Sequence, residues 1–330
     1  MSTTADYKLF TPLELVQGLV LKNRIVFAPM TRARTDPVTH VPSDMNALYY
    51  EQRAGAGLII TEATSVSEQG HGWYGAPALY NEAQLAGWKK VVDRVHAKGG
   101  KIFLQMWHIG RQGHSSHNEK NDLVSASDVR LETGHAKNNK GEYVPYETPR
   151  PLRMDEIPGI AEDFRRSAEL AKRAGFDGVE LHSANGYLFD QFFQSVTNKR
   201  TDMYGGTFEN RARILFVVLD AIKKVFPSDR IAIRLAPNGA FAEMGCEDNA
   251  EFFTYLFEKL SDWGLAYLGI LDGVGFGYHT KCRLLAAFDA KKHFKGTPPY
   301  EHYWDPAKGA EGYVDYPPYT PSVDKVSIQN

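Results

Sequence analysis

One unit recurs along the chain and limits the choice of fold more than any other feature. It consists of a helical stretch, a short joint that contains glycine, and an apolar, β-rich run. Four copies have this form, at YYEQRAGAGLIITEA (49–63), VHAKGGKIFLQMW (95–107), AKRAGFDGVELH (171–182) and LSDWGLAYLGILDG (260–273). A fifth, VFPSDRIAIRLAP (225–237), has Pro-Ser-Asp as its joint. Glycine past a helix end, followed at once by a Val/Ile/Leu-rich strand, is typical of α/β folds.

The strands of this unit are continuous apolar runs, which indicates parallel strands covered by helices. The stretch 83–99 has helical periodicity, with an apolar face formed by Leu85, Trp88, Val91, Val92 and Val95. With NRIVFAPM (23–30) as the first strand, we count about six βα units and predict an α/β barrel of the TIM (β/α)8 type. An open doubly wound sheet is the alternative, although no GxGxxG motif follows the first strand. Before that strand, residues 9–25 predict a hairpin that turns at Gln17–Gly18 and is placed to close the bottom of a barrel.

Composition narrows the expected partners and compartment. The 330 residues carry a formal net charge of −2 with interleaved signs, so we expect neither nucleic acid nor an anionic membrane as a partner. The two cysteines, Cys246 and Cys282, belong to no CxxC or metal-ligand spacing, which favours a reducing compartment. The N-terminus has no signal-peptide pattern, and no apolar run reaches the length of a membrane span. We therefore expect a soluble, cytoplasmic protein, monomeric or homodimeric, that acts on a small molecule.

The predicted strand ends carry polar and aromatic side chains, and in an α/β barrel the reactive groups collect at the carboxyl ends of the strands. These residues are Thr31, Glu62, Gln105, Trp107, His108, Arg111, His182, Asn185, Tyr187 and Arg234. Arg234 stands in an otherwise apolar strand, and a buried arginine must be paired or face an anionic ligand. Gln105 has both a donor and an acceptor to satisfy in mid-strand. The set contains no nucleophile–base dyad and no paired carboxylates, so it indicates a cofactor or carbonyl site.

Several long motifs, in the same order, resemble the old yellow enzyme family. They are LKNRIVFAPMTRAR, HIGRQGH, GFDGVELHSANGYLFDQFF and NKRTDMYGGTFENRAR, and the resemblance runs from about Leu9 to Phe276 and resumes at 309–317. Members of the family are FMN-dependent ene reductases on an α/β barrel. The resemblance implies that NADPH reduces a bound FMN, which then passes hydride to the β-carbon of an α,β-unsaturated carbonyl compound.

The resemblance also implies which residues contact the cofactor. Thr31 would hydrogen-bond flavin O4, Gln105 would meet the pyrimidine edge, and Arg234 would lie near N1 and O2. The backbone at Pro29 and Ala63 would lie along the ring. The full set implied at FMN is Pro29, Met30, Thr31, Ala63, Gln105, His182 and Arg234.

On the substrate side, the resemblance implies that His182 and Asn185 hydrogen-bond the carbonyl oxygen and stabilise the developing enolate. Tyr187 would deliver a proton to the α-carbon. The residues implied at the substrate are Trp107, His182, Asn185, Tyr187 and Tyr303. Three histidines in one loop, His108, His114 and His117, have no matching carboxylate there, so we expect no metal site.

The last quarter of the chain departs from the family pattern. A helical stretch (282–297) is expected to end near Thr297, and the Pro/Tyr-rich segment 298–330 has no strand-like run. The family has two further strands here, whose loops hold the FMN phosphate. We therefore expect residues 1–297 to form a barrel that lacks about two C-terminal βα units, with 298–330 packing on it. Such a barrel would have two open sheet edges and would retain FMN weakly.

Two alternatives follow from this departure and from the residues themselves. A catalytically impaired relative, acting as a ligand-binding or regulatory protein, would suit a chain without the phosphate-binding loops. A flavin-independent barrel, such as an isomerase, would use His182 and Tyr187 for proton transfer.

Overall fold

A seven-stranded parallel sheet forms the centre of the computed structural model, which describes residues 7–271 and 277–294. The strand order is β13-β12-β11-β6-β4-β3, and β5 also pairs with β6. The bounds are β3 Val26–Phe27, β4 Leu58–Ile60, β5 Thr64–Ser65, β6 Ile102–Trp107, β11 Gly178–Ser183, β12 Ile231–Leu235 and β13 Tyr267–Ile270. Successive strands are neighbours throughout, as in a barrel, whereas a doubly wound sheet reverses its direction. The fold is therefore of the TIM-barrel type, and the doubly wound alternative is wrong.

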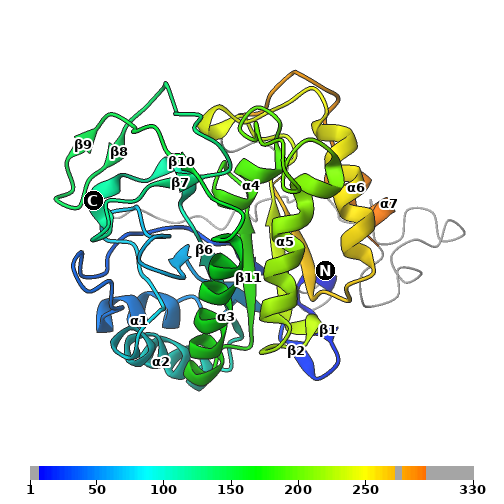
Figure 1. Cartoon of the computed structure of the whole chain (residues 1–330). Helices are drawn as coiled ribbons and strands as arrows, with labels where there is room; N and C mark the ends of the chain where they lie inside the picture. The colour runs from blue at the N-terminus through cyan, green and yellow to red at the C-terminus, as the bar shows by residue number, and fades with distance from the viewer. Residues whose placement is uncertain (1–6, 272–276, 295–330) are drawn as a thin grey trace, which may run out of the picture. The chain divides into compact units, whose positions relative to one another are not determined.

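Helices pack along the outer side of the sheet, as Figure 1 shows for α3 and α5 in front of β11. Their bounds are α1 Asp44–Glu51, α2 Glu82–Ala97, α3 Ile157–Ala174, α4 Leu188–Phe193, α5 Phe208–Ile222, α6 Asn249–Ser261 and α7 Ala287–His293. The apolar face predicted for α2 is buried, except that Leu85 is half-buried. Helix α3 ends at Gly175, whose φ of +94° is a conformation that glycine adopts without strain.

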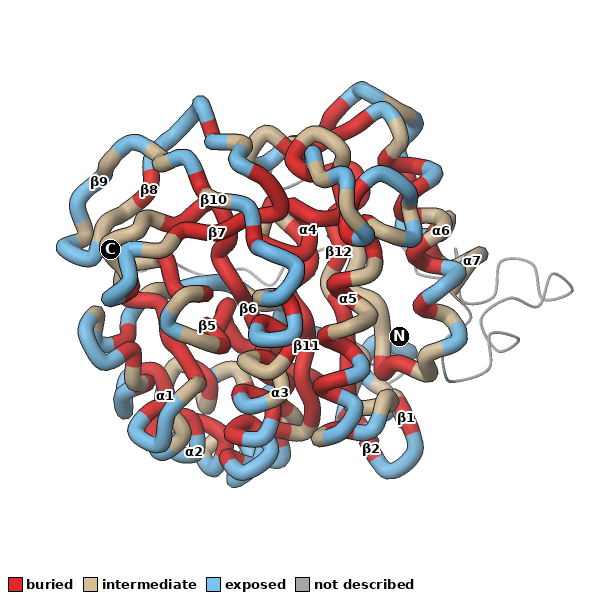
Figure 2. Tube along the Cα trace, in the orientation of Figure 1, coloured by how far each residue is buried: buried red, intermediate tan, exposed pale blue. Residues whose placement is uncertain are grey.

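Every residue of the central strands β4, β6 and β11 is buried, which explains why these strands are continuous apolar runs (Figure 2). Side chains alternate between the faces. The outward ones, including Ile102, Leu104, Val179, Leu181, Ile231 and Ile233, pack with the helices in one large core. Inside the sheet, packing leaves no room at Gly178, where a Cβ would lie 2.4 Å from Phe103 Cζ and 2.5 Å from the carbonyl oxygen of Arg230.

The N-terminal hairpin closes the amino-terminal end of the sheet, as predicted. Strands β1 (Leu13–Val16) and β2 (Leu19–Leu21) are antiparallel, and Gly18 in the turn has a φ of +75°. The apolar side chains of the hairpin pack with inward-facing residues of the sheet, which are Leu58, Ile60, Phe103 and Ala232, and with Ala266 just before β13. This apolar floor fills the lower part of the barrel.

Short strands and 3-10 turns form the loops at the opposite end, towards the top of Figure 1. Strand β7 (Val124–Ser125) pairs with β10 (Arg150–Pro151), and β8 (Ala136–Lys137) pairs with β9 (Tyr143–Val144). The 3-10 turns at this end are η3 Gly110–Gln112, η4 Ser115–His117 and η6 Phe241–Glu243, whereas η2 Lys8–Phe10 and η5 Ser228–Arg230 precede β1 and β12 at the hairpin end. The repeat pattern in the sequence did not predict this layer.

Two predicted elements are shorter than expected. The first strand, predicted over 23–30, is reduced to β3 because its later residues turn away into a loop. The helix predicted over 282–297 begins only at Ala287 and ends at His293. Its start is delayed because Asn238 binds both backbone groups of Leu285: the Leu285 N–H donates to Oδ1 and its carbonyl accepts from Nδ2, each at 2.8 Å.

Within the described residues, β3 and β13 each pair with one neighbouring strand, so the sheet has two edges. Val26 in β3 is 48% exposed, and all of β13 is half-buried. The segment 298–330 lies outside the described residues, as does Tyr303, so the expected domain division and the missing units stay predictions. No described helix combines the length and apolar character needed to cross a membrane.

Candidate active site

A cavity of about 300 Å³ lies at the carboxyl ends of the strands, at the end of the sheet opposite the hairpin. Its lining comes from the loop after β3, the loop after β5, the ends of β6, β11 and β12, and the loops that follow them. The residues are Pro29, Met30, Thr31, Trp73, Gln105, Trp107, His182, Asn185, Tyr187, Arg234 and Phe241. All except Trp73 and Phe241 are residues that the sequence singled out, so the fold brings the predicted set together.

Glu62, at the end of β4, holds the loop that carries Thr31. Its Oε2 accepts hydrogen bonds from the backbone N–H groups of Arg32 at 2.9 Å and Ala33 at 3.0 Å. The Tyr50 hydroxyl donates to Oε1 of the same carboxylate at 3.3 Å. Burial raises the pKa of Glu62, and the backbone donors oppose that rise. Ala33 has a φ of +50°, which a residue with a side chain rarely adopts. The hydrogen bonds from Arg32 and Ala33 to Glu62 stabilise the loop in this conformation.

A polar layer separates the apolar floor from the cavity. Gln105 Nε2 donates to Glu180 Oε1 at 2.7 Å, and the Tyr267 hydroxyl donates to Glu180 Oε2 at 2.9 Å. Glu180 is fully buried. Burial raises the pKa of Glu180, and the nearby charge of Arg234 opposes that rise. Among the described residues, Gln105 Oε1 has no hydrogen-bond partner, and Gln105 lines the cavity.

His182 and Arg234 lie side by side, because they are partners in the register of β11 and β12. Burial, and then the charge of Arg234, hold the pKa of His182 well below its usual value, so the imidazole is neutral at physiological pH. Its Nδ1 is buried without a partner among the described residues, as is Trp107 Nε1. Buried polar atoms are rarely left unpaired in a folded protein, so these two indicate a place for a bound group.

The turn after β11 presents Asn185 and Tyr187 to the cavity. Asn185 has a φ of +58°, and its carbonyl oxygen accepts from Gln112 Nε2 at 2.7 Å, which fixes the turn. The Tyr187 ring stands edge-on to both Trp107 and His182, with centroid separations of 5.3 and 4.8 Å. Burial raises the pKa of Tyr187 well above its usual value, so its hydroxyl stays protonated.

Trp73 and Phe241 line the cavity but were missed in the sequence. Phe241 lies in η6, next to Ala242 and Glu243, whose φ values of +56° and +58° are unusual for residues with side chains. Arg111 Nη2 holds this turn by donating to the Ala242 carbonyl at 2.8 Å. Trp73 had one available signal, a tryptophan within the glycine-rich HGWYG of a loop that follows a strand.

Some predicted residues lie elsewhere. Ala63 is buried beside Trp107 in a small apolar cluster and does not line the cavity, so the expected role of its backbone stays a prediction. His108 Nδ1 accepts from the Gly110 N–H at 3.1 Å, and burial lowers the pKa of His108 to about 3. His117 Nε2 bonds the Lys137 carbonyl at 2.7 Å. The part of the chain that the structure describes contains no group of three or more His, Cys, Asp or Glu residues suited to a metal ion.

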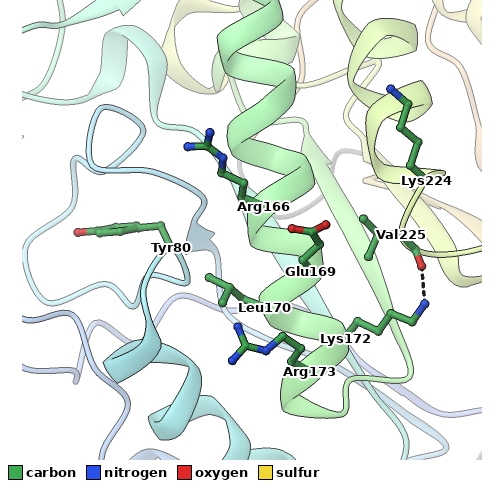
Figure 3. A pocket seen from close by; sticks show the side chains of 8 residues that line it. All are labelled: Tyr80, Arg166, Glu169, Leu170, Lys172, Arg173, Lys224 and Val225. Atoms are coloured by element: carbon green, nitrogen blue, oxygen red, sulfur yellow. Dashed lines mark hydrogen bonds between the residues drawn. The ribbon is translucent and has the colours of Figure 1, made fainter.

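A second groove, of about 550 Å³, runs along the outside of α3, and Figure 3 shows the side chains that line it. They are Tyr80, Arg166, Glu169, Leu170, Lys172, Arg173, Lys224 and Val225. Lys172 donates to the Val225 carbonyl at 2.8 Å, and Arg173 pairs with Glu82 at 2.7 Å. Since Lys172 and Arg173 already have protein partners and the groove is open, we assign no chemistry to it.

Comparisons with known proteins identify the family. Residues 8–270 match the model of the NADH:flavin oxidoreductase / NADH oxidase family. The chain is also similar to the solved structure of the old yellow enzyme homologue from Zymomonas mobilis, with a TM-score of 0.82 and 36% identity, covering 93% of this chain and 86% of that one. The chain belongs to the old yellow enzyme family. The solved structure of morphinone reductase is similar as well, with a TM-score of 0.80 and 41% identity. The match covers 89% of this chain and 79% of that one.

Two similar curated proteins are also named as reductases. The chanoclavine-I aldehyde reductase fgaOx3 of Penicillium roqueforti is 41% identical over 270 residues, which are 80% of this chain and 70% of that protein. The 12-oxophytodienoate reductase 1 of Oryza sativa is 36% identical over 329 residues, which are 97% of this chain and 84% of the relative. The chain is therefore an oxidoreductase of an FMN-dependent family.

The residues at the cavity fit an isoalloxazine ring. The unpaired Nδ1 of His182 is a hydrogen-bonding position that a polar heterocycle can satisfy. Gln105 bonds Glu180 through Nε2, which leaves its Oε1 as an acceptor for such a ring. Arg234 supplies a fixed positive charge beside them, on the strand next to His182. A ring whose pyrimidine edge offers N–H donors and carbonyl acceptors matches this set of groups.

Proposed function

We propose that the chain is an FMN-dependent ene reductase that oxidises NADPH and reduces the C=C bond of α,β-unsaturated carbonyl compounds. The observation that supports the proposal most strongly is that His182, Asn185 and Tyr187 line the same 300 Å³ cavity as Thr31, Gln105 and Arg234. Groups suited to a carbonyl oxygen therefore lie within one site with groups suited to a flavin.

FMN, when bound, supplies the hydride that reaches the β-carbon of the substrate. Pro29, Met30, Thr31, Gln105 and Arg234 are the residues we assign to holding it, together with the backbone of Ala63. Gln105 would bind the pyrimidine edge, and Arg234 would stabilise negative charge near N1 and O2. Thr31, on the loop held by Glu62, would bind O4.

His182 and Asn185 would hold the carbonyl oxygen of the substrate. Negative charge grows on that oxygen when the β-carbon is reduced, and two fixed donors stabilise it. The neutral state of His182 suits this role, because a neutral imidazole donates one N–H without bringing a full charge into a buried site.

Tyr187 would protonate the α-carbon. Its raised pKa keeps the proton on the phenol until a strongly basic enolate carbon is present. The edge-on contacts with Trp107 and His182 restrain the ring, so the hydroxyl approaches from a defined side. Trp107 would also limit the size of the substrate.

An anaerobic experiment tests the proposal. Protein reconstituted with FMN should lose its yellow colour when NADPH is added and regain it when cyclohexenone follows. Protein that binds FMN but shows neither change would refute the proposed function.

A further inference from the structure

Glu180 is a buried carboxyl group that the proposed reaction does not use. It has no exposed surface, lies in the middle of β11, and is two residues before His182, so both side chains face the inside of the barrel. Burying a carboxylate is unfavourable unless hydrogen bonds and opposite charge compensate it. The structure supplies both, from Gln105, Tyr267 and Arg234.

The first consequence concerns the orientation of Gln105. An ionised carboxylate only accepts hydrogen bonds, so the Gln105 side chain must turn its NH₂ group, and not its oxygen, towards Glu180 Oε1. Gln105 Oε1 is then presented as an acceptor. Without Glu180, the amide could rotate by half a turn and exchange donor for acceptor. Glu180 therefore decides which edge of a heterocycle Gln105 can recognise.

The second consequence concerns charge. Glu180 is paired in register with Ala232, and Arg234 lies two residues further along the same strand, on the same inward face. Arg234 therefore faces the cavity with a negative charge behind it, which lowers its effective positive charge.

We propose that Glu180 is a positioning residue that orients the amide of Gln105 and offsets the charge of Arg234, and that it thereby sets both the affinity for FMN and the midpoint potential of the flavin. The inference rests on the proposed function only in that FMN binds at this cavity. It assigns to Glu180 no contact with substrate.

Two variants separate the two effects. Glu180→Gln removes the charge and keeps the size and an acceptor for Gln105. A reduced flavin carries added negative charge, so loss of a nearby carboxylate should favour reduction. One unit charge ~10 Å away, at an effective dielectric constant of ~20, changes this equilibrium on the order of tenfold. For a two-electron couple, tenfold is ~30 mV, and the midpoint potential should become less negative by about that amount. Glu180→Asp keeps the charge and is too short to reach Gln105, so it should weaken FMN binding by at least about tenfold, because a hydrogen bond to a charged group is lost. Its potential should stay closer to that of the wild type.

The measurements are FMN titration of the apoprotein and equilibrium reduction against a reference dye. An unchanged potential in Glu180→Gln would overturn the charge effect. Wild-type affinity in Glu180→Asp would overturn the orientation effect, and this variant carries the test if Glu180→Gln does not fold. Wild-type protein that binds FMN yet reduces no enone would refute the proposed function and leave the inference about Glu180 standing.

Discussion

Replacing Tyr187 by phenylalanine should slow alkene reduction and leave flavin reduction by NADPH unchanged. The ring contacts with Trp107 and His182 involve no hydroxyl, so phenylalanine preserves them. The hydroxyl itself has no hydrogen-bond partner in the described part of the chain, so its loss should change the free energy of unfolding by no more than ~0.5 kcal/mol. The variant therefore removes the proposed proton donor and leaves the fold unchanged.

The expected loss of rate follows from the proposed role of Tyr187 as a general acid. A positioned general acid contributes ~10²–10⁴-fold, which corresponds to ~2.7–5.4 kcal/mol in the activation barrier. The pKa of Tyr187 is raised, so the wild-type phenol stays protonated as pH rises past ~10, and donation should not fail over the range ~6–9. Any loss with rising pH in that range must come from another group.

Anaerobic stopped-flow measurement separates the two half-reactions. Reduction of bound FMN by NADPH should match the wild type, while reoxidation by cyclohexenone should fall by the factor above. Tyr255→Phe, on the outer helix α6, is the matched control and should change neither rate. A Tyr187→Phe protein that is reoxidised by the enone at the wild-type rate would show that the proton comes from elsewhere.

Three further outcomes are expected. Asn185→Ala should reduce the rate of enone reduction by ~10²–10³-fold at saturating NADPH, because one of two donors to the developing enolate is lost; an unchanged rate would exclude the amide as a donor. Gly178→Ala should lower the free energy of unfolding by ~1–3 kcal/mol in urea denaturation, because the added Cβ meets Phe103 and a backbone carbonyl; wild-type stability would mean that the interior has more space than the structure shows. We also predict, from the expected lack of two C-terminal βα units, that the chain retains FMN more weakly during dialysis than relatives that have these units, and protein that stays fully yellow would contradict this.

Much of the fold could be predicted because the helix–joint–strand unit is local. Each copy contains its own glycine or proline and its own apolar run, so the strands could be counted before their pairing was known. The cavity followed, because parallel strands in sequential order must bring their carboxyl ends together. Gln105, His182 and Arg234 were identified in this way, each as a polar residue in or after an apolar strand.

What could not be predicted depends on contacts between distant segments. Glu180 lies in GVELH, which is apolar enough to predict a strand, but its partners Gln105 and Tyr267 are 75 and 87 residues away. The late start of α7 depends on Asn238, which is 47 residues before Leu285. Phe241 lines the cavity from a turn in which two residues have positive φ values, and no sequence pattern predicts these values. Pairings of this kind become visible only once the strands have been assembled.

The loop proposed to support the flavin follows one of the two shortest strands of the sheet, at its edge. Strand β3 has two residues, is paired in the described structure only with β4, and leads directly to Pro29 and Thr31. Local unfolding of β3 would displace Pro29 and Thr31, which we assign to the flavin site. Binding of FMN and ordering of β3 should therefore be thermodynamically coupled. Amide hydrogens of residues 26–33 should then exchange quickly in apoprotein and slow markedly once FMN is bound, so that the protein acquires its most complete native state only with the ligand in place.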